Sequence, residues 1–270
     1  VCVGRRRRKM ERMRNELNVA TVRPILAATK EENEITSKLL LEGKRAEDRA
    51  ANQLRKIFLK TGVTTQARGS AYVEFGKTKV ICSVFGPRTA SKSGFSDTGR
   101  VEVDLKYATF SSRHQRRSFQ TNSEEKEISS LLTQTFQSSV ILDRYPKSVI
   151  DLYFLILEDD GGVLSAAITA GSLALAHGTI EMFDLTASCS VSRVNETNLL
   201  DPTEAEQNQQ SSCVTVAYHS SLESIPQIIH AGEISVSSFQ QLTELAIDGA
   251  VKIDGLMRKA LAKSLTPEST

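Results

Sequence analysis

The feature that most constrains the fold is a nearly continuous apolar run, VIDLYFLIL at residues 149–157, followed at once by EDDGG and VLSAAITAGSLALAHG. Such a run is typical of a strand that is covered on both faces and lies in the centre of a sheet. The acidic, glycine-containing segment marks the end of that strand. Residues 163–178 are rich in Ala, Ser and Gly, so they predict a helix that packs closely and ends at Gly178.

Two short β-rich runs, SAYVEFG and TKVICSVFG, stand upstream and are separated only by Lys77 after Gly76. They predict a hairpin. The alternating run VEVDLKYATF at residues 101–110 predicts a strand with one solvent-facing side. We expect these three strands to be antiparallel. Residues 30–60 mix charges with scattered apolar residues and predict no clear element.

A helix is predicted after these strands, with Ser123 as its N-cap and an end before Pro146. Acidic residues in the first turn favour this helix start, because they interact well with the helix dipole. Its apolar face is formed by Ile128, Leu131, Leu132, Phe136 and Val140.

The last third of the chain predicts further strands at LTASCSVSRV, SCVTVAYHS and SIPQIIHAGEI. An acidic loop, NETNLLDPTEAEQNQQ, joins the first two of them. Apolar residues at helical spacing from Phe239 to Leu261 predict a long final helix. Strands mixed with helices in this way indicate the α+β class, a two-layer fold of mixed sheet and packed helices.

The composition narrows the class of protein. The chain has 270 residues, of which 40% are hydrophobic, enough for a substantial core. No run approaches the roughly 18 apolar residues of a membrane helix, and no signal peptide is visible, so we expect an intracellular protein without a membrane partner. The cysteines lack the spacing of a zinc or redox site and are interpreted as reduced, buried thiols: Cys2, Cys82, Cys189 and Cys213. The histidines are isolated and predict neither a metal site nor a catalytic triad: His114, His177, His219 and His230.

The start of the chain is strongly basic. Seven positive charges in residues 5–14 stand against Glu11 alone, so this start carries +6 and the remaining chain −4 in a total of +2. One interpretation is a nuclear-localisation or nucleic-acid-contacting arm, and the other is a solvated tail without such a role.

Three motifs occur in one order along the chain: ARGSAYVEFGKTKVICSVFGPR, the strand–EDDGG–helix unit and LLDPTEAE. Together they resemble the RNase PH family of phosphorolytic exoribonucleases, and this resemblance implies an RNase PH-like fold. Within the family, the GPR at residues 86–88, the EMFDL at residues 181–185 and the LLDPTEAE look most like a ring subunit of the eukaryotic RNA exosome.

The resemblance also implies a division of the chain into three regions. Residues 54–265 form the expected RNase PH-like domain. Residues 1–53 are expected to be a basic, poorly matched lead-in that is partly disordered, and residues 266–270 a tail. The Arg-Pro that commonly precedes the first strand of the family is Arg55-Lys56 here.

Active members of the family use phosphate to attack the terminal RNA linkage, which requires donors that hold an anion and carboxylates that bind a metal. In those members a Gly-Gly or Ala-Gly turn is followed by Ser or Thr and then Arg. Here Gly161-Gly162 is followed by Val163-Leu164. An aliphatic pair offers neither a charge nor a side-chain donor, so phosphate would lose its bidentate partner.

Two more positions test the chemistry that the resemblance implies. An Arg-Arg-Ser stretch of catalytic relatives is replaced by Ser123-Glu124-Glu125. In the acidic loop, Asp201 stands at the first of two Asp positions, but Gln207 stands at the second. Glu204 and Glu206 would substitute only with displaced carboxylates. We interpret Asp201 as a cap of the turn that begins at Pro202, and we predict no catalytic residue.

The resemblance therefore implies a non-catalytic structural subunit of the exosome ring, without a cofactor, that supports 3′-to-5′ RNA processing and degradation. The implied partners are other RNase PH-like ring subunits, cap subunits with OB- and KH-type domains, associated hydrolytic ribonucleases and RNA. The expected location is the nucleus, nucleolus and cytoplasm. The alternatives are an active phosphate-dependent 3′-to-5′ exoribonuclease and a free-standing RNA-binding protein.

One loop points to RNA contact. Arg113, Arg116 and Arg117 follow the predicted strand that ends in Phe110, and the counterpart of this loop in the family faces the central channel of the ring. Guanidinium groups there can pass single-stranded RNA by phosphate contact. The other interpretation is a solvated loop, or one that pairs with glutamates of a neighbour. Arg88 and Arg100 are weaker candidates.

Overall fold

The computed structural model describes residues 45, 49–89, 97–113, 116–194 and 197–265. The chain divides into two units, residues 1–48 and residues 49–270, and every element below belongs to the second unit. The basic start with Cys2, nearly all of the expected lead-in before residue 49, His114 and the tail at residues 266–270 lie outside the described residues.

Within these ranges, the first sheet has the order β1-β2-β3-β5-β4 and consists of β1 (Ile57–Thr61), β2 (Gly69–Phe75), β3 (Thr78–Thr89), β4 (Arg100–Tyr107) and β5 (Ser148–Glu158). The hairpin is confirmed, since β2 and β3 are antiparallel and Phe75 pairs with Thr78. The expected antiparallel arrangement of β4 is wrong, because β4 pairs with β5 in parallel. A helix follows β4 and brings the chain back to the end of the sheet at which β4 begins. Strand β5 can then run parallel to β4. Strand β1 was not predicted.

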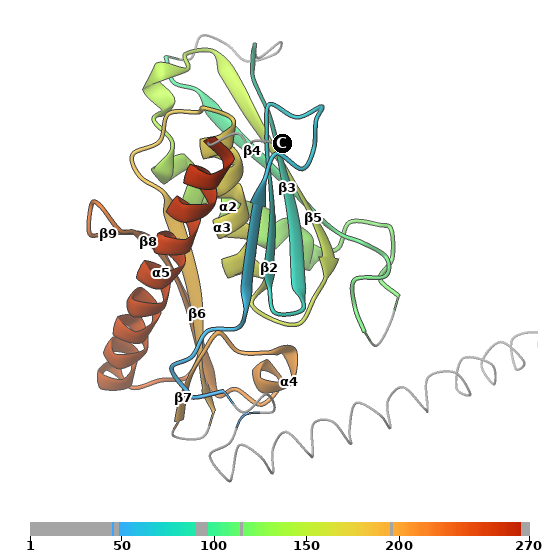
Figure 1. Cartoon of the computed structure of the whole chain (residues 1–270). Helices are drawn as coiled ribbons and strands as arrows, with labels where there is room; N and C mark the ends of the chain where they lie inside the picture. The colour runs from blue at the N-terminus through green and yellow to red at the C-terminus, as the bar shows by residue number, and fades with distance from the viewer. Residues whose placement is uncertain (1–44, 46–48, 90–96, 114–115, 195–196, 266–270) are drawn as a thin grey trace, which may run out of the picture. The chain divides into compact units, whose positions relative to one another are not determined.

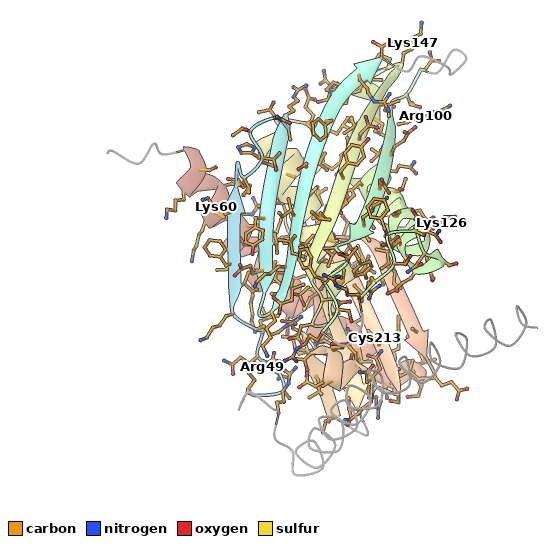
Figure 2. The ribbon with its side chains drawn as sticks, turned by 90° about the vertical axis from the view of Figure 1, so that its right-hand side faces the viewer. Arg49, Lys60, Arg100, Lys126, Lys147 and Cys213 are labelled. Carbon is orange, nitrogen blue, oxygen red and sulfur yellow. The ribbon has the colours of Figure 1, made fainter. Side chains whose placement is uncertain are left out.

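Strand β5 lies between β3 and β4, as predicted for a central strand. The prediction that both its faces are covered is wrong. Leu152, Phe154 and Ile156 are buried on the inner face, whereas Tyr153 and Leu155 on the outer face are 47% and 41% exposed. Figure 2 looks onto this outer face, and no element of the described part of the chain covers it there.

Helices α2 (Ser123–Ser139) and α3 (Val163–His177) pack against the first sheet (Figure 1). Asn122 rather than Ser123 is the N-cap of α2, because its N–H donates to the Glu125 carboxylate (3.0 Å) and completes a capping box. Helix α3 ends as predicted, with Gly178 as its C-cap. A Cβ on Gly171 of α3 would lie 2.2 Å from the Phe136 ring, so glycine permits the close helix packing that its composition predicted.

The second sheet has the order β7-β6-β8-β9 and is built from β6 (Thr186–Val194), β7 (Thr197–Leu200), β8 (Ser212–His219) and β9 (Ser224–Gly232). Three of these strands and the final helix, α5 (Val236–Leu265), match the prediction. The acidic loop also forms elements that were not predicted, β7 and the short helix α4 (Glu204–Gln207). The short helix η1 (Leu142–Arg144) precedes β5.

Strand β6 is covered on both faces. The space beside Gly249 of α5 is filled by Cys189, and the Thr186 hydroxyl lies 3.0 Å from Ser139 of α2. Because successive side chains of a strand alternate, these two contacts lie on opposite faces of β6. The α+β class with mixed sheet and packed helices is confirmed.

The predicted burial of the cysteines holds for two of the three that lie in the described ranges. Cys82 and Cys189 are buried free thiols, and Cys213 is a half-buried free thiol. Burial raises the pKa of the Cys82 and Cys189 thiols, so both stay protonated. None of the helices in the described ranges combines the length and apolar character needed to cross a membrane.

Candidate functional site

The turn at residues 159–162 is where the segments singled out by the resemblance meet. The Glu204 N–H donates to the Asp160 carbonyl (3.1 Å), and the Arg117 guanidinium donates to the Asp159 carboxylate (3.1 Å). Gly161 and Gly162 have φ values of 81° and 66°, in the left-handed region that glycine adopts without strain. The fold thus brings together the three positions that test for phosphorolysis.

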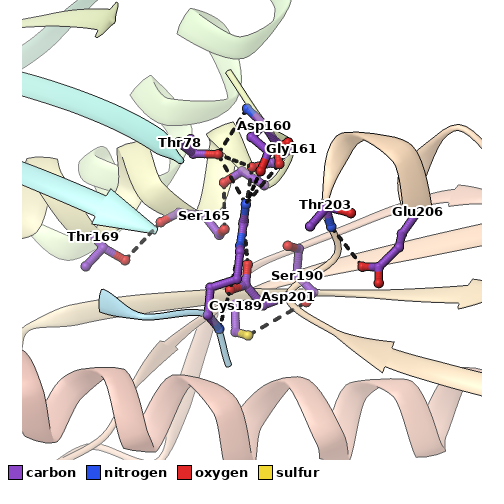
Figure 3. A network of polar contacts seen from close by, with 12 residues as sticks. Thr78, Asp160, Gly161, Ser165, Thr169, Cys189, Ser190, Asp201, Thr203 and Glu206 are labelled. Carbon is purple, nitrogen blue, oxygen red and sulfur yellow. Dashed lines mark hydrogen bonds and ion pairs between the residues drawn. The ribbon is translucent and has the colours of Figure 1, made fainter. Parts of the chain in front are cut away.

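Arg55 lies at the centre of this site and contacts Asp160, Gly161 and Asp201, all three of which are labelled in Figure 3. Its Nη2 is 2.6 Å from Asp201 Oδ1, and its Nε is 2.9 Å from Asp201 Oδ2. The same guanidinium donates to the carbonyls of Asp160 (2.9 Å) and Gly161 (3.1 Å). Burial lowers the pKa of Arg55, but the charge and hydrogen bonds of Asp201 outweigh this effect and raise it. Arg55 is therefore a buried, permanently charged clamp between the start of β1, the turn and the acidic loop.

The interpretation of Asp201 as a turn cap is wrong. Thr203 is the N-cap of α4, and its N–H donates to the Glu206 carboxylate (2.9 Å). The Asp201 carboxylate instead accepts the guanidinium and the backbone N–H of Arg55 (3.1 Å). Arg55 stands at the arginine of the family's Arg-Pro, with Lys56 in place of the proline, but its buried pairing with Asp201 was not predicted.

The acidic loop offers an amide where catalytic relatives have a second Asp. A Cβ on Gly161 would lie 3.0 Å from Gln207 Oε1, so the Gln207 side chain faces the turn. Glu206 is buried within its capping box, with Arg49 Nη2 at 3.9 Å. Among the residues that the structure describes, no group of three or more His, Cys, Asp or Glu side chains is arranged to hold a metal ion.

The acidic residues that replace the Arg-Arg-Ser stretch have structural contacts. Glu125 is buried and accepts from the Tyr107 N–H (3.1 Å). Glu124 accepts from Arg117 Nη1 (3.0 Å). Burial raises the pKa of Asp159, although the Gly161 N–H and the Arg117 charge partly lower it. Glu124 and Asp159 therefore share the Arg117 guanidinium beside the turn.

The three arginines that were predicted to bind RNA differ in their exposure and in their contacts. Arg117 is half-buried, lies 3.7 Å from the centroid of the Tyr107 ring and pairs with Glu124 and Asp159. Arg113 and Arg116 are exposed. The guanidinium of Arg117 thus fixes the loop, and the other two face solvent.

The two weaker candidates lie at the far end of the first sheet. Arg88 pairs with Asp151, with Nη2 3.0 Å from Oδ1, and Arg100 is exposed at the start of β4 (Figure 2).

The fold and this turn define an RNase PH-like protein, and comparison with known families agrees. Residues 53–181 match the model of the 3′ exoribonuclease family, domain 1, and residues 184–249 match that of domain 2. The chain belongs to the RNase PH family of 3′ exoribonucleases.

Two named relatives and one solved structure are similar to most of this chain. The chain is 34% identical over 225 residues to the exosome complex component RRP41-like of Arabidopsis thaliana, covering 83% of this chain and 86% of that protein. It is 32% identical over 233 residues to the human exosome complex component MTR3, covering 80% of this chain and 85% of the relative. The crystal structure of rice Rrp46 superposes with a TM-score of 0.74 at 25% identity, covering 81% of this chain and 100% of the rice chain.

Proposed function

We propose that this protein is a non-catalytic subunit of an RNA exosome ring that supports 3′-to-5′ RNA processing and degradation. The observation that carries the proposal is the turn at residues 159–162, which is occupied by contacts within the chain itself. Four carboxylates and two guanidinium groups surround it: Glu124, Asp159, Asp160, Asp201, Arg55 and Arg117. Relatives of this chain are named exosome components, which supports the choice of assembly.

The chemistry of the turn argues against phosphorolysis. Inorganic phosphate needs donors and positive charge, whereas the carboxylates here outnumber the guanidinium groups, and both guanidinium groups are paired. Helix α3 begins with Val163 and Leu164, which supply no side-chain donor. An anion entering this turn would meet the backbone N–H groups at the start of α3, but the two guanidinium groups beside it are already engaged by carboxylates, so its lost hydration would be poorly compensated.

We assign the chain to the mRNA transport regulator 3 type rather than to the RRP41 type. The GPR at residues 86–88, the EMFDL at residues 181–185 and the LLDPTEAE loop favour that assignment. The proposed location is the nucleus, nucleolus and cytoplasm.

The outer face of the first sheet supports an assembled state. Phe58, Phe85, Tyr153 and Leu155 are exposed there, and the Phe85 and Tyr153 rings pack edge to face. We call these four residues the sheet patch. Exposed apolar groups of this kind mark interaction surfaces. The proposed partners are other RNase PH-like ring subunits, joined in the whole assembly by OB/KH-type cap subunits and hydrolytic ribonucleases.

The exposed arginines of the loop, Arg113 and Arg116, are the proposed RNA contacts. Phosphate contacts by guanidinium groups do not depend on the RNA sequence, so they suit a subunit that contacts RNAs of many sequences. Arg117 contributes by holding the loop against Tyr107 and the turn.

The test is to incubate the purified chain, alone and in its reconstituted ring, with RNA, phosphate and magnesium, beside an active RNase PH enzyme as the positive control. We expect no nucleoside diphosphate from the chain. Release of nucleoside diphosphate by the chain itself would establish the active-enzyme alternative. A second arm purifies the tagged protein from cells with its stoichiometric partners. Recovery of RNase PH-like proteins in equal amounts supports the ring, and recovery of the chain alone supports a free-standing RNA-binding protein.

A further inference from the structure

Two phenylalanines flank the basic loop and are among the most exposed aromatic side chains of the described residues. Phe110 is 65% exposed and Phe119 is 83% exposed. The loop between them is closed at its base, since the Arg117 N–H donates to the Thr109 carbonyl (3.1 Å). Both rings therefore project from a fixed base rather than from a loose segment.

The base of the loop is fixed by further contacts. The Ser111 N–H donates to the Ala108 carbonyl (2.9 Å), and the Asp159 N–H donates to the Ser111 carbonyl (3.0 Å). Arg117 adds its ion pairs to Glu124 and Asp159. These contacts attach the base of the loop to the end of β5 and to α2. Binding of a ligand to the rings therefore costs little conformational entropy of the loop.

The chemistry around the rings is cationic. Lys106 Nζ lies 5.1 Å from the centroid of the Phe119 ring, in a cation–π contact that holds one side of the ring. Its high exposure leaves the other side open. Arg113 and Arg116 are exposed in the same loop. Aromatic rings beside exposed cations are what binding of single-stranded nucleic acid requires, because every base has a face that stacks and every nucleotide carries a phosphate.

We infer that Phe119, with Phe110 as a second ring, is a stacking platform for the bases of single-stranded RNA that passes the basic loop. The inference rests on the proposed function, in which Arg113 and Arg116 contact RNA, and adds a contact to the bases. Lys106 orients the Phe119 ring and places a positive charge beside the stacked nucleotide. Stacking is tolerant of base identity, so the platform grips RNA without selecting its sequence.

The experiment measures binding of the full chain, alone and in its reconstituted ring, to a fluorescent uridine homopolymer and to an abasic oligonucleotide of equal length. The abasic probe keeps the phosphates and lacks the bases. Phe119→Leu keeps an apolar side chain but removes the ring. Phe183→Leu is the matched control, since Phe183 is 58% exposed and lies outside the loop.

We expect Phe119→Leu to weaken binding of the uridine homopolymer at least about fivefold, the lower end for loss of one stacked base, and Phe110→Leu to weaken it less. Binding of the abasic probe and binding by Phe183→Leu should not change. Equal losses for both probes, or no loss, would overturn the inference. Loss of ring assembly in Phe119→Leu would also overturn it, by assigning the ring to a protein neighbour.

The proposed RNA contact has a separate readout. Arg113→Gln with Arg116→Gln should weaken both probes alike. If this double variant loses binding while Phe119→Leu does not, the proposed function stands and the stacking platform fails. If neither variant changes binding, both fail.

Discussion

Arg55 and Asp201 lie 146 positions apart in the sequence and form a bidentate ion pair, with Nη2 2.6 Å from Oδ1 and Nε 2.9 Å from Oδ2. Arg55 belongs to the region matched by the first family domain, and Asp201 to the region matched by the second. The pair therefore joins the two matched regions beside the turn at residues 159–162.

Replacing Asp201 with Asn should destabilise the chain by about 3 kcal/mol, the lower end for breaking a buried ion pair, because Arg55 loses its bidentate partner and keeps only the more distant Asp160 carboxylate, 3.9 Å from Nη1. Asn tolerates the left-handed φ of 52° at this position, so the backbone is not strained by the change. Urea denaturation followed by circular dichroism measures the effect. The control is Lys79→Met, which removes a partly exposed pair with Glu158 (2.9 Å) and should cost no more than about 1 kcal/mol. Equal losses in the two variants would contradict the central role of Arg55.

Gly171 and Gly255 provide a matched pair of helix glycines. Gly171→Ala places a Cβ 2.2 Å from Phe136 and 2.8 Å from Phe154, so we expect a loss of about 1–3 kcal/mol from overpacking. Gly255→Ala meets nothing within 4 Å and should instead stabilise α5 by about 0.8–1 kcal/mol through helix propensity. Thermal unfolding of both variants measures the difference. A stabilised Gly171→Ala variant would show that α3 can move away from α2.

His219 predicts a pH dependence of stability. It is buried, with Nε2 3.0 Å from Thr186 Oγ1 and Nδ1 3.3 Å from Ser224 Oγ. Burial lowers the pKa of His219, and the charge of Asp184 partly offsets this effect. The unfolded chain then takes up a proton more readily than the folded chain. The stabilisation is therefore fully present above pH about 6.5 and is lost as pH falls through the lower folded-state pKa.

The measurement is the free energy of unfolding against pH for the native chain, His219→Gln and Ser139→Ala. His219→Gln should be less stable at neutral pH but should depend less on pH below about 6.5. Ser139→Ala removes a hydroxyl 3.2 Å from Nε2 and keeps the imidazole, so it should lose stability and retain the pH dependence. The same slope in His219→Gln and the native chain would rule out this role of His219.

Arg113 and Arg116 should determine the salt dependence of RNA binding. If each contacts one phosphate, its replacement by Gln lowers the slope of log K against log salt by about 0.7 for single strands. Titrations with RNA at several salt concentrations give the slope. Lys126→Gln, which removes an exposed cation from α2, serves as the control and should leave the slope unchanged. An unchanged slope in the arginine variants would remove this loop from the RNA path.

The sheet patch should be needed for assembly. Leu155→Glu places a charge in the patch, and burying an unpaired charge in an interface is costly, so the yield of reconstituted ring should fall. Leu222→Glu introduces the same charge at an exposed leucine outside the patch and should assemble normally. Size-exclusion chromatography with circular dichroism separates loss of assembly from loss of folding. Normal assembly of Leu155→Glu would show that this face is not the interface.

Local sequence patterns predicted the individual elements well, because a helix or a hairpin forms between residues that are close in the sequence. The alternation and turn at Gly76 specified the hairpin, and the spacing from Phe239 to Leu261 specified α5. The parallel pairing of β4 could not be read this way, because the alternation in residues 101–110 is the same for either strand direction. The exposure of Tyr153 also escaped prediction, since an apolar run does not distinguish a buried face from an interface.

The candidate site was predicted in part. The resemblance directed attention to Gly161, Asp201 and Gln207, and the fold brings their segments together. The role of Asp201 was misread because its partner, Arg55, is distant in the sequence and no local pattern links the two residues. The pairing of Arg117 with Asp159 could not be read from the sequence either, because the two residues are 42 positions apart and only the fold brings them together.

The covered faces of β6 bear on whether the two family-matched regions can fold separately. Its hydroxyl-rich side, with Thr186, Ser188 and Ser190 buried, faces helices that precede the boundary between the two family-matched regions. A gene fragment that encoded only residues 184–249 would expose this side and lose Arg55 as well. The two matched regions therefore depend on each other for burial and for charge pairing, so neither should fold as an independent unit.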